Sequence, residues 1–298
     1  MRKNILLRDR PARPFAYLLV VTLLVLVASM SSATLAADKM KAADVVAKHL
    51  ESIGTAAARS TAKSRLIAGN SRATYKARNS TGSIDGNVAV GSVNRNSLLA
   101  ILFDAPNYPG EKFGFDGKKL TVGYITPGIR SALGNFVVQY GEVFREGVMG
   151  GTLSTAWALL NVEESGAKLA YGGTEKIDDR ETHKLNYSPK KGSELRITMY
   201  FDATTFEHVR TQYTRTVSAR LAAGGIDNQA RQQETRYKIV ENFSGYKKEG
   251  ELNLPHNYTL QLEVHTTTGS SMEKWEMDFS QFLFDQPIED GKFNVEAS

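Results

Sequence analysis

Three segments in the second half of the chain alternate strictly between apolar and polar residues. Their apolar positions are Leu195, Ile197, Met199 and Phe201, then Tyr258, Leu260, Leu262 and Val264, then Trp275, Met277 and Phe279. Because successive side chains of a strand point to opposite faces, each segment predicts a strand with one buried and one solvated face. Similar patterns, separated by turn signals such as Asp116-Gly117, cover residues 65–126 and predict about ten or eleven strands in total.

Two segments have helical spacing instead. Residues 37–53 place their apolar side chains on one face and end before Gly54, and His49 lies on that face, where we expect a core histidine with satisfied hydrogen bonds. Between residues 129 and 161, apolar residues recur every three or four positions on both sides of a glycine-rich stretch at 147–151. We predict two or three short helices there, packed against the apolar face of the sheet in a single β-rich domain.

The first 36 residues have the pattern of a secretory signal peptide. Five basic residues precede or flank the start of an apolar run at 15–27, and small residues follow it up to Ala36. We predict cleavage after Ala36, export to the periplasm and a mature soluble domain of residues 37–298. An uncleaved N-terminal anchor is the alternative, because the apolar run reaches Met30 if Ser29 is tolerated.

Charge and cysteine content narrow the functional classes. Residues 1–36 carry +4 of the chain's net charge of +5, so the remaining 262 residues sum to +1 and do not indicate a nucleic-acid partner. The chain has no cysteine, which excludes disulfides and a lipid-modified cysteine. The mature domain must therefore be stabilised by its core.

The sequence contains no catalytic or metal-binding motif that we recognise. None of the five histidines forms an i,i+4 pair, no Gly-x-Ser-x-Gly is present, and the glycine-rich stretch at 147–152 lacks the lysine of a phosphate-binding loop. We therefore expect no enzymatic activity, no metal and no cofactor. A hydrolase built from dispersed polar residues remains an alternative, since triads assemble from distant positions.

An apolar sheet face and an apolar helical segment together have two possible roles. They either form a filled core, or enclose a cavity for an apolar ligand, with the 147–151 stretch acting as a hinge of the cover. The residues that would contact such a ligand are Leu133, Phe136, Val137, Tyr140, Phe144 and Trp157 from the cover, and Leu195, Ile197, Met199, Phe201, Tyr258, Leu260 and Leu262 from the sheet.

Four stretches resemble the LolA/LolB superfamily, and more closely the outer membrane lipoprotein-sorting proteins. The stretches, in order, are a helix at Ala42–Ile53, the turn Phe115-Asp116-Gly117-Lys118-Lys119-Leu120, the turn Phe201-Asp202-Ala203-Thr204-Thr205, and Phe243-Ser244-Gly245-Tyr246 followed by Gly250 and Leu254-Pro255. Each motif is short, and it is their order and spacing that carries the resemblance. The chain departs from the family in its greater length around residues 215–234.

The resemblance implies a curved antiparallel half-barrel of about eleven strands, with helices covering its concave apolar face. It implies a periplasmic carrier that shields lipid or lipoprotein acyl chains from water without a cofactor, with an envelope membrane protein as donor or acceptor. We expect a monomer. The alternative within the same fold is an RseB-like sensor, in which lipid binding controls a protein partner.

Overall fold

The computed structural model describes residues 40–77, 80–217 and 234–296. The predicted signal peptide and most of the 215–234 stretch lie outside the described residues. Among the residues that are described, no helix is long and apolar enough to cross a membrane.

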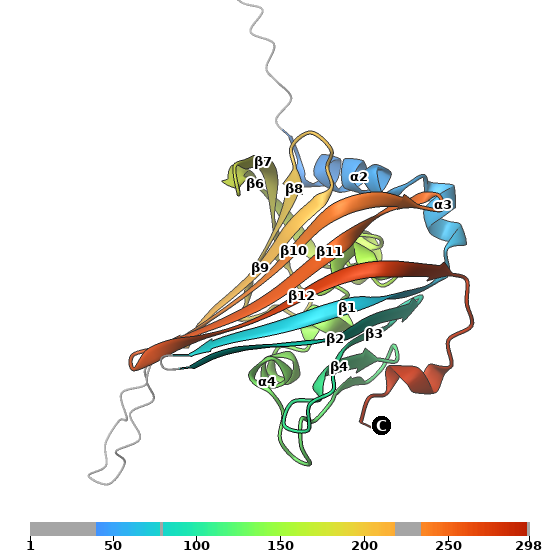
Figure 1. Ribbon diagram of the computed structural model, residues 1–298. Coiled ribbons are helices and arrows are strands. Elements are labelled where there is room, and N and C mark those ends of the chain that lie inside the picture. Colours follow the sequence, from blue (N-terminus) through green and yellow to red (C-terminus); the bar gives the residue numbers. More distant parts are fainter. Residues whose placement is uncertain (1–39, 78–79, 218–233, 297–298) are drawn as a thin grey trace, which may run out of the picture. The chain divides into compact units, whose positions relative to one another are not determined.

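The described chain forms one antiparallel sheet of twelve strands, in the order β5-β4-β3-β2-β1-β12-β11-β10-β9-β8-β7-β6 (Figure 1). The predicted fold class is confirmed: the described chain is mainly β, its sheet is curved and antiparallel, and the edge strands β5 and β6 do not pair with each other. The strands are β1 (Ser64–Ala77), β2 (Ser80–Val93), β3 (Asn96–Phe103), β4 (Gly110–Phe115), β5 (Leu120–Val122), β6 (Lys168–Ile177), β7 (Arg180–Ser188), β8 (Arg196–Asp202), β9 (His208–Val217), β10 (Thr235–Glu249), β11 (Leu252–Thr266) and β12 (Gly269–Phe284).

The strand order dictates where the helical segment must run. Strands β1 to β5 follow one another from the centre of the sheet to one edge. Strands β6 to β12 follow one another from the opposite edge back to the centre, where β12 pairs with β1. Residues 123–167 join the two edges, so they must cross one face of the sheet, and they cross the concave one (Figure 1). The helices are α2 (Ala42–Ile53), α3 (Ala56–Thr61), α4 (Ala132–Gln139), α5 (Glu142–Arg145) and α6 (Val162–Ser165), with 3-10 turns η1 (Gly151–Leu153) and η2 (Asp290–Phe293).

We call residues 131–160 the covering segment. Its first helix, α4, begins after Ser131, whose Oγ accepts a hydrogen bond from the Gly134 N–H at 2.7 Å and so caps the helix. The prediction that Ile129 belongs to this apolar helix was wrong. The Ile129 N–H donates to the Thr126 carbonyl at 2.9 Å, and the side chain is 57% exposed.

The turns at which the sequence motifs were recognised are built by aspartates. Asp202 Oδ1 accepts from the backbone N–H groups of Thr204 and Thr205, both at 2.8 Å, and this bond pattern closes the loop between β8 and β9. Asp116 organises the β4–β5 turn in the same way. A short side chain that bonds the backbone two or three residues ahead is the usual reason that Asp begins a turn.

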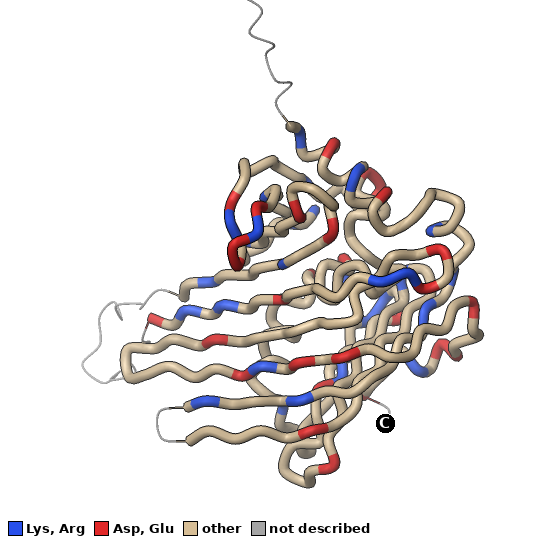
Figure 2. Tube along the Cα trace, turned by 45° about the horizontal axis from the view of Figure 1, so that its top comes forward, with Lys and Arg blue, Asp and Glu red and all other residues tan. Residues whose placement is uncertain are grey.

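The polar faces of the strands carry interspersed charges. Figure 2 shows basic and acidic residues interspersed along neighbouring strands. Some form ion pairs, such as Arg72 Nε with Asp85 Oδ1 at 2.6 Å between β1 and β2, and Lys274 Nζ with Glu276 Oε1 at 2.6 Å along β12. Exposed pairs of this kind contribute little stability, so the sheet depends on its apolar concave face.

Candidate ligand-binding site

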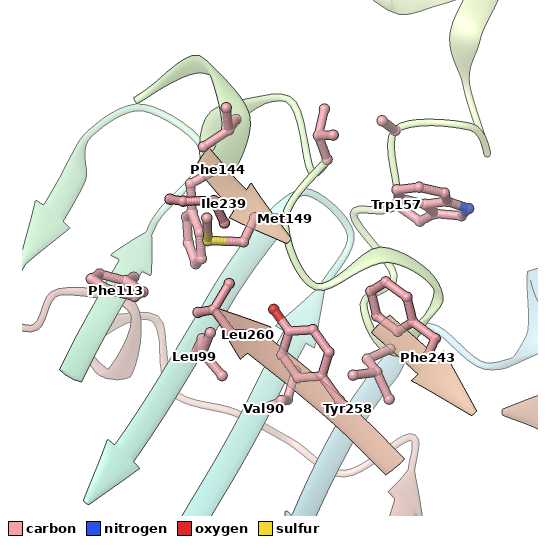
Figure 3. Packing of buried hydrophobic residues seen from close by; sticks show 14 of the residues in the cluster. Val90, Leu99, Phe113, Phe144, Met149, Trp157, Ile239, Phe243, Tyr258 and Leu260 are labelled. Carbon is pink, nitrogen blue, oxygen red and sulfur yellow. The ribbon is translucent and has the colours of Figure 1, made fainter. Parts of the chain in front are cut away.

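The concave face and the covering segment share one buried hydrophobic cluster. All thirteen candidate ligand contacts belong to it, and none is more than 7% exposed. Figure 3 shows Phe144 and Trp157 of the covering segment facing Tyr258 and Leu260 of β11. The candidates from the sheet thus lie on its buried face, as the alternation predicts. Their contact with a ligand stays a prediction.

A buried carboxylate joins the covering segment to the sheet. Glu241 of β10 is fully buried, and its Oε1 accepts from the Gly150 N–H at 2.8 Å and from the Tyr258 hydroxyl at 2.5 Å. Its Oε2 accepts from the Tyr213 hydroxyl, also at 2.5 Å. Burial raises the pKa of Glu241 to about 7, although the three donors favour the charged form. Gly150 has a φ of 81°, a conformation that favours glycine and that aims its N–H at the carboxylate.

A buried arginine holds the next residues of the same loop. Arg65 of β1 is 2% exposed, and its Nη1 donates to the Thr152 carbonyl at 2.7 Å. Within the described residues Arg65 has no carboxylate partner, and burial lowers its pKa to about 10. Two charged groups from opposite sides of the sheet centre therefore both bind the loop at residues 150–152.

His49 links α2 to the covering segment. Its Nε2 accepts from Trp157 Nε1 at 3.0 Å, so Nδ1 carries the proton and donates to the Phe206 carbonyl at 2.9 Å. Burial lowers the pKa of His49 to about 4, which keeps the ring neutral at physiological pH. The expectation of a core histidine with satisfied hydrogen bonds is confirmed. The ring of Trp157 also stacks on His208, with centroids 4.9 Å apart.

A cavity of about 500 Å³ opens on the concave side beside the start of the covering segment. We call it the Trp275 cavity. Its wall is mostly apolar and includes Ala73 and Tyr75 of β1, Ile84 of β2, Trp275 of β12 and Ile125. None of the thirteen predicted contacts lines it. Its volume is within the range of about 300–1,000 Å³ that is typical of small-molecule sites.

A hydrogen-bonded chain connects the wall of this cavity to the covering segment. Trp275 Nε1 donates to the Tyr108 hydroxyl at 2.9 Å, and that hydroxyl donates to Glu111 Oε1 at 2.7 Å. Ser131, the cap of α4, donates to Glu111 Oε2, also at 2.7 Å. Glu111 is 3% exposed, and burial raises its pKa to about 7.

Sequence reasoning missed the charged residues of the concave face, although the alternation contains the signal for them. Glu241 lies between Ile239 and Phe243, two positions from each, and Glu273 lies two positions before Trp275. Charged residues at apolar positions of an alternating strand are rarely buried without a function or a partner. Among the described residues, no group of three or more His, Asp and Glu side chains could hold a metal ion.

No protein-family model matches the sequence, and no curated protein matches it. Solved structures do match. A LolA superfamily protein from Nitrosomonas europaea is 16% identical, covers 87% of this chain and 100% of its own, and has a TM-score of 0.48. A DUF1329 family protein from Desulfovibrio piger has 13% identity, coverage of 85% and 97%, and a TM-score of 0.44.

A third match is described as an outer membrane lipoprotein-sorting protein domain, from Vibrio parahaemolyticus. It is 13% identical, covers 85% of this chain and 97% of its own, and has a TM-score of 0.42. The first and third descriptions name the family that the four sequence motifs resemble. All three TM-scores are below 0.5, so these structures carry no argument about the function of this chain.

Proposed function

We propose that the protein binds lipids or acyl chains on the concave face of its half-barrel and carries them through the periplasm. The observation that supports this most directly is the Trp275 cavity, which is apolar and opens where the covering segment begins. Ala73 and Trp275 belong both to the cavity wall and to the buried cluster that contains the thirteen candidate contacts. An apolar chain that enters the cavity therefore lies at the edge of the predicted site.

The energetics of such a site are favourable. Burying a methylene group contributes about 0.8 kcal/mol, so ten methylenes contribute about 8 kcal/mol before the costs of binding. A longer chain extends into the cluster only if the covering segment moves. We expect that movement to hinge at residues 147–151, because Gly147, Gly150 and Gly151 all have positive φ, a region of backbone conformation that glycine enters freely.

The proposal is tested first by what the protein holds when it is purified. The chain is expressed with its own leader, recovered from a bacterial periplasm, and studied by native mass spectrometry followed by organic extraction. A discrete lipid mass that leaves on extraction supports the proposal. A clean protein mass, with no uptake of added fatty acids or lipopeptides, contradicts it and favours a filled core.

Movement of the covering segment is tested by locking it. Ser92 Oγ of β2 accepts from the Thr155 N–H at 2.9 Å, and the chain has no cysteine that would compete with an engineered pair. In the double variant Ser92→Cys/Thr155→Cys, we expect a disulfide that blocks uptake of long-chain lipids when oxidised and permits it when reduced. The two single variants are the controls. Equal uptake by the oxidised and reduced forms would show that the segment stays closed during binding.

A further inference from the structure

The wall of the Trp275 cavity contains a carboxylate at a position where the strand pattern calls for an apolar side chain. Glu273 lies on the same face of β12 as Trp275 and Met277. Its neighbours across the sheet are Tyr75 of β1 and Leu262 of β11. Glu273 therefore interrupts the apolar concave face where the Trp275 cavity opens, beside the start of the covering segment.

Within the described part of the chain, Glu273 has no hydrogen bond or ion pair, and desolvation alone raises its pKa. Glu241 and Glu111, the two other carboxylates on this face, each accept two or more hydrogen bonds. A desolvated carboxylate without a partner costs free energy that a cationic ligand group would recover.

Three aromatic side chains lie in the wall of the same cavity. Tyr75, Tyr108 and Trp275 all line the cavity together with Glu273. The faces of Tyr and Trp rings attract cations, and sites that combine such rings bind quaternary ammonium groups. Trp275 and Tyr108 are fixed by their mutual hydrogen bond, so two of the three rings are held in place before a ligand arrives.

The side chain of Arg130 also lines the cavity, but its guanidinium already binds other groups of the protein. Arg130 Nε donates to the Val122 carbonyl at 3.1 Å, and its Nη2 donates to Glu296 Oε1 at 3.5 Å. Its guanidinium lies 4.0 Å from the centroid of the Tyr124 ring. Arg130 therefore does not neutralise Glu273.

We infer that the Trp275 cavity selects amphiphiles whose head group carries an ammonium ion, which Glu273 and the three aromatic rings hold while the apolar body lies against the remaining wall. This inference rests on the proposed function, since it names the class of ligand that the same site takes. Charge complementarity decides the class of head group. An anionic head group would be repelled by the unpartnered carboxylate of Glu273, and a neutral head group would leave that carboxylate without a counter-charge.

The test is isothermal titration of the mature protein with three twelve-carbon amphiphiles below their micellar concentrations: dodecyltrimethylammonium, dodecanoate and dodecyl maltoside. We expect dodecyltrimethylammonium to bind about tenfold tighter than the other two. The Glu273→Gln variant should lose most of that preference. Glu276→Gln is the matched control, because it removes the same charge from the polar face of the same strand and should keep the preference.

The outcomes separate the two proposals. Equal binding of the three amphiphiles, or a preference that survives in Glu273→Gln, overturns the inference about the head group and leaves lipid binding intact. If none of the three binds and no lipid is recovered from the purified protein, the proposed function itself is wrong. Because Gln has the shape of Glu and lacks its charge, Glu273→Gln should fold normally, which circular dichroism checks.

Discussion

The two ends of the concave face are built from the same strands and differ in what fills them. At the covered end the covering segment fills the concave face, and buried polar side chains bind it: Glu241 and Arg65 bind its loop, and His49 accepts from Trp157. At the open end, Tyr75 is 50% exposed and Glu273 has no partner among the described residues. The covered end is organised for stability, and the open end has the features of a binding site.

The largest expected effect is a loss of stability when a large side chain is removed from the covered end. Trp157→Ala removes a side chain that is 2% exposed, and such truncations cost about 3–5 kcal/mol. Urea unfolding followed by far-ultraviolet circular dichroism measures this loss. Trp157→Phe is the control: it keeps a ring but leaves His49 Nε2 without its donor, at a cost of about 1–3 kcal/mol. If Trp157→Ala unfolds like the wild type, the covering segment does not contribute to stability.

The second effect depends on pH and arises from Glu241. The pKa of Glu241 is about 7 in the folded protein against 4.5 as a free group, so the folded state holds the proton more tightly. The stabilising contribution of protonated Glu241 is fully present below pH 4.5 and is lost as the pH rises through 7. Over that window the free energy of unfolding should fall by about 3 kcal/mol on account of this residue.

Glu241→Gln should remove that part of the pH dependence. The measurement is urea unfolding of both proteins at pH 5 and pH 7.5, and the quantity compared is the change in unfolding free energy between the two pH values. Glu276→Gln, on the polar face of β12, is expected to leave the change as it is in the wild type. An unaltered pH dependence in Glu241→Gln would mean that the carboxylate does not hold a proton in the fold.

A third, smaller effect concerns how tightly the covering segment is held. Arg65→Met removes the donor to the Thr152 carbonyl and also removes a desolvated charge, so global stability should change little. The variant lacks a charge-assisted hydrogen bond to the loop, so the free energy of local opening of the loop should fall by about 1.4 kcal/mol. Amide exchange there should then be about tenfold faster. Hydrogen exchange of residues 147–155 measures this. Unchanged exchange there would show that the Arg65 bond does not hold the loop.

The difference between the two ends also shows what the sequence could predict. Strict alternation identified the inward faces of the β8, β11 and β12 regions, because a face is a local property with a period of two. The path of the covering segment was less predictable: Ile129 has helical spacing but lies in a turn, because the cap at Ser131 starts the helix later. The Trp275 cavity was not predictable, because it depends on how far strands β1, β2 and β12 extend beyond the covering segment, which is distant from them in sequence.

The smallest effect on stability comes from the open end, where the effect on binding should be clear. Tyr75→Ala removes a half-exposed ring from the cavity wall, so unfolding should change by less than about 1 kcal/mol. Its affinity for dodecyltrimethylammonium should fall about three- to tenfold through loss of a cation–π contact. Leu283→Ala is the matched control, because Leu283 is 48% exposed and does not line the cavity. If the two variants bind alike, the head group is held elsewhere, and the open end is merely unfilled sheet.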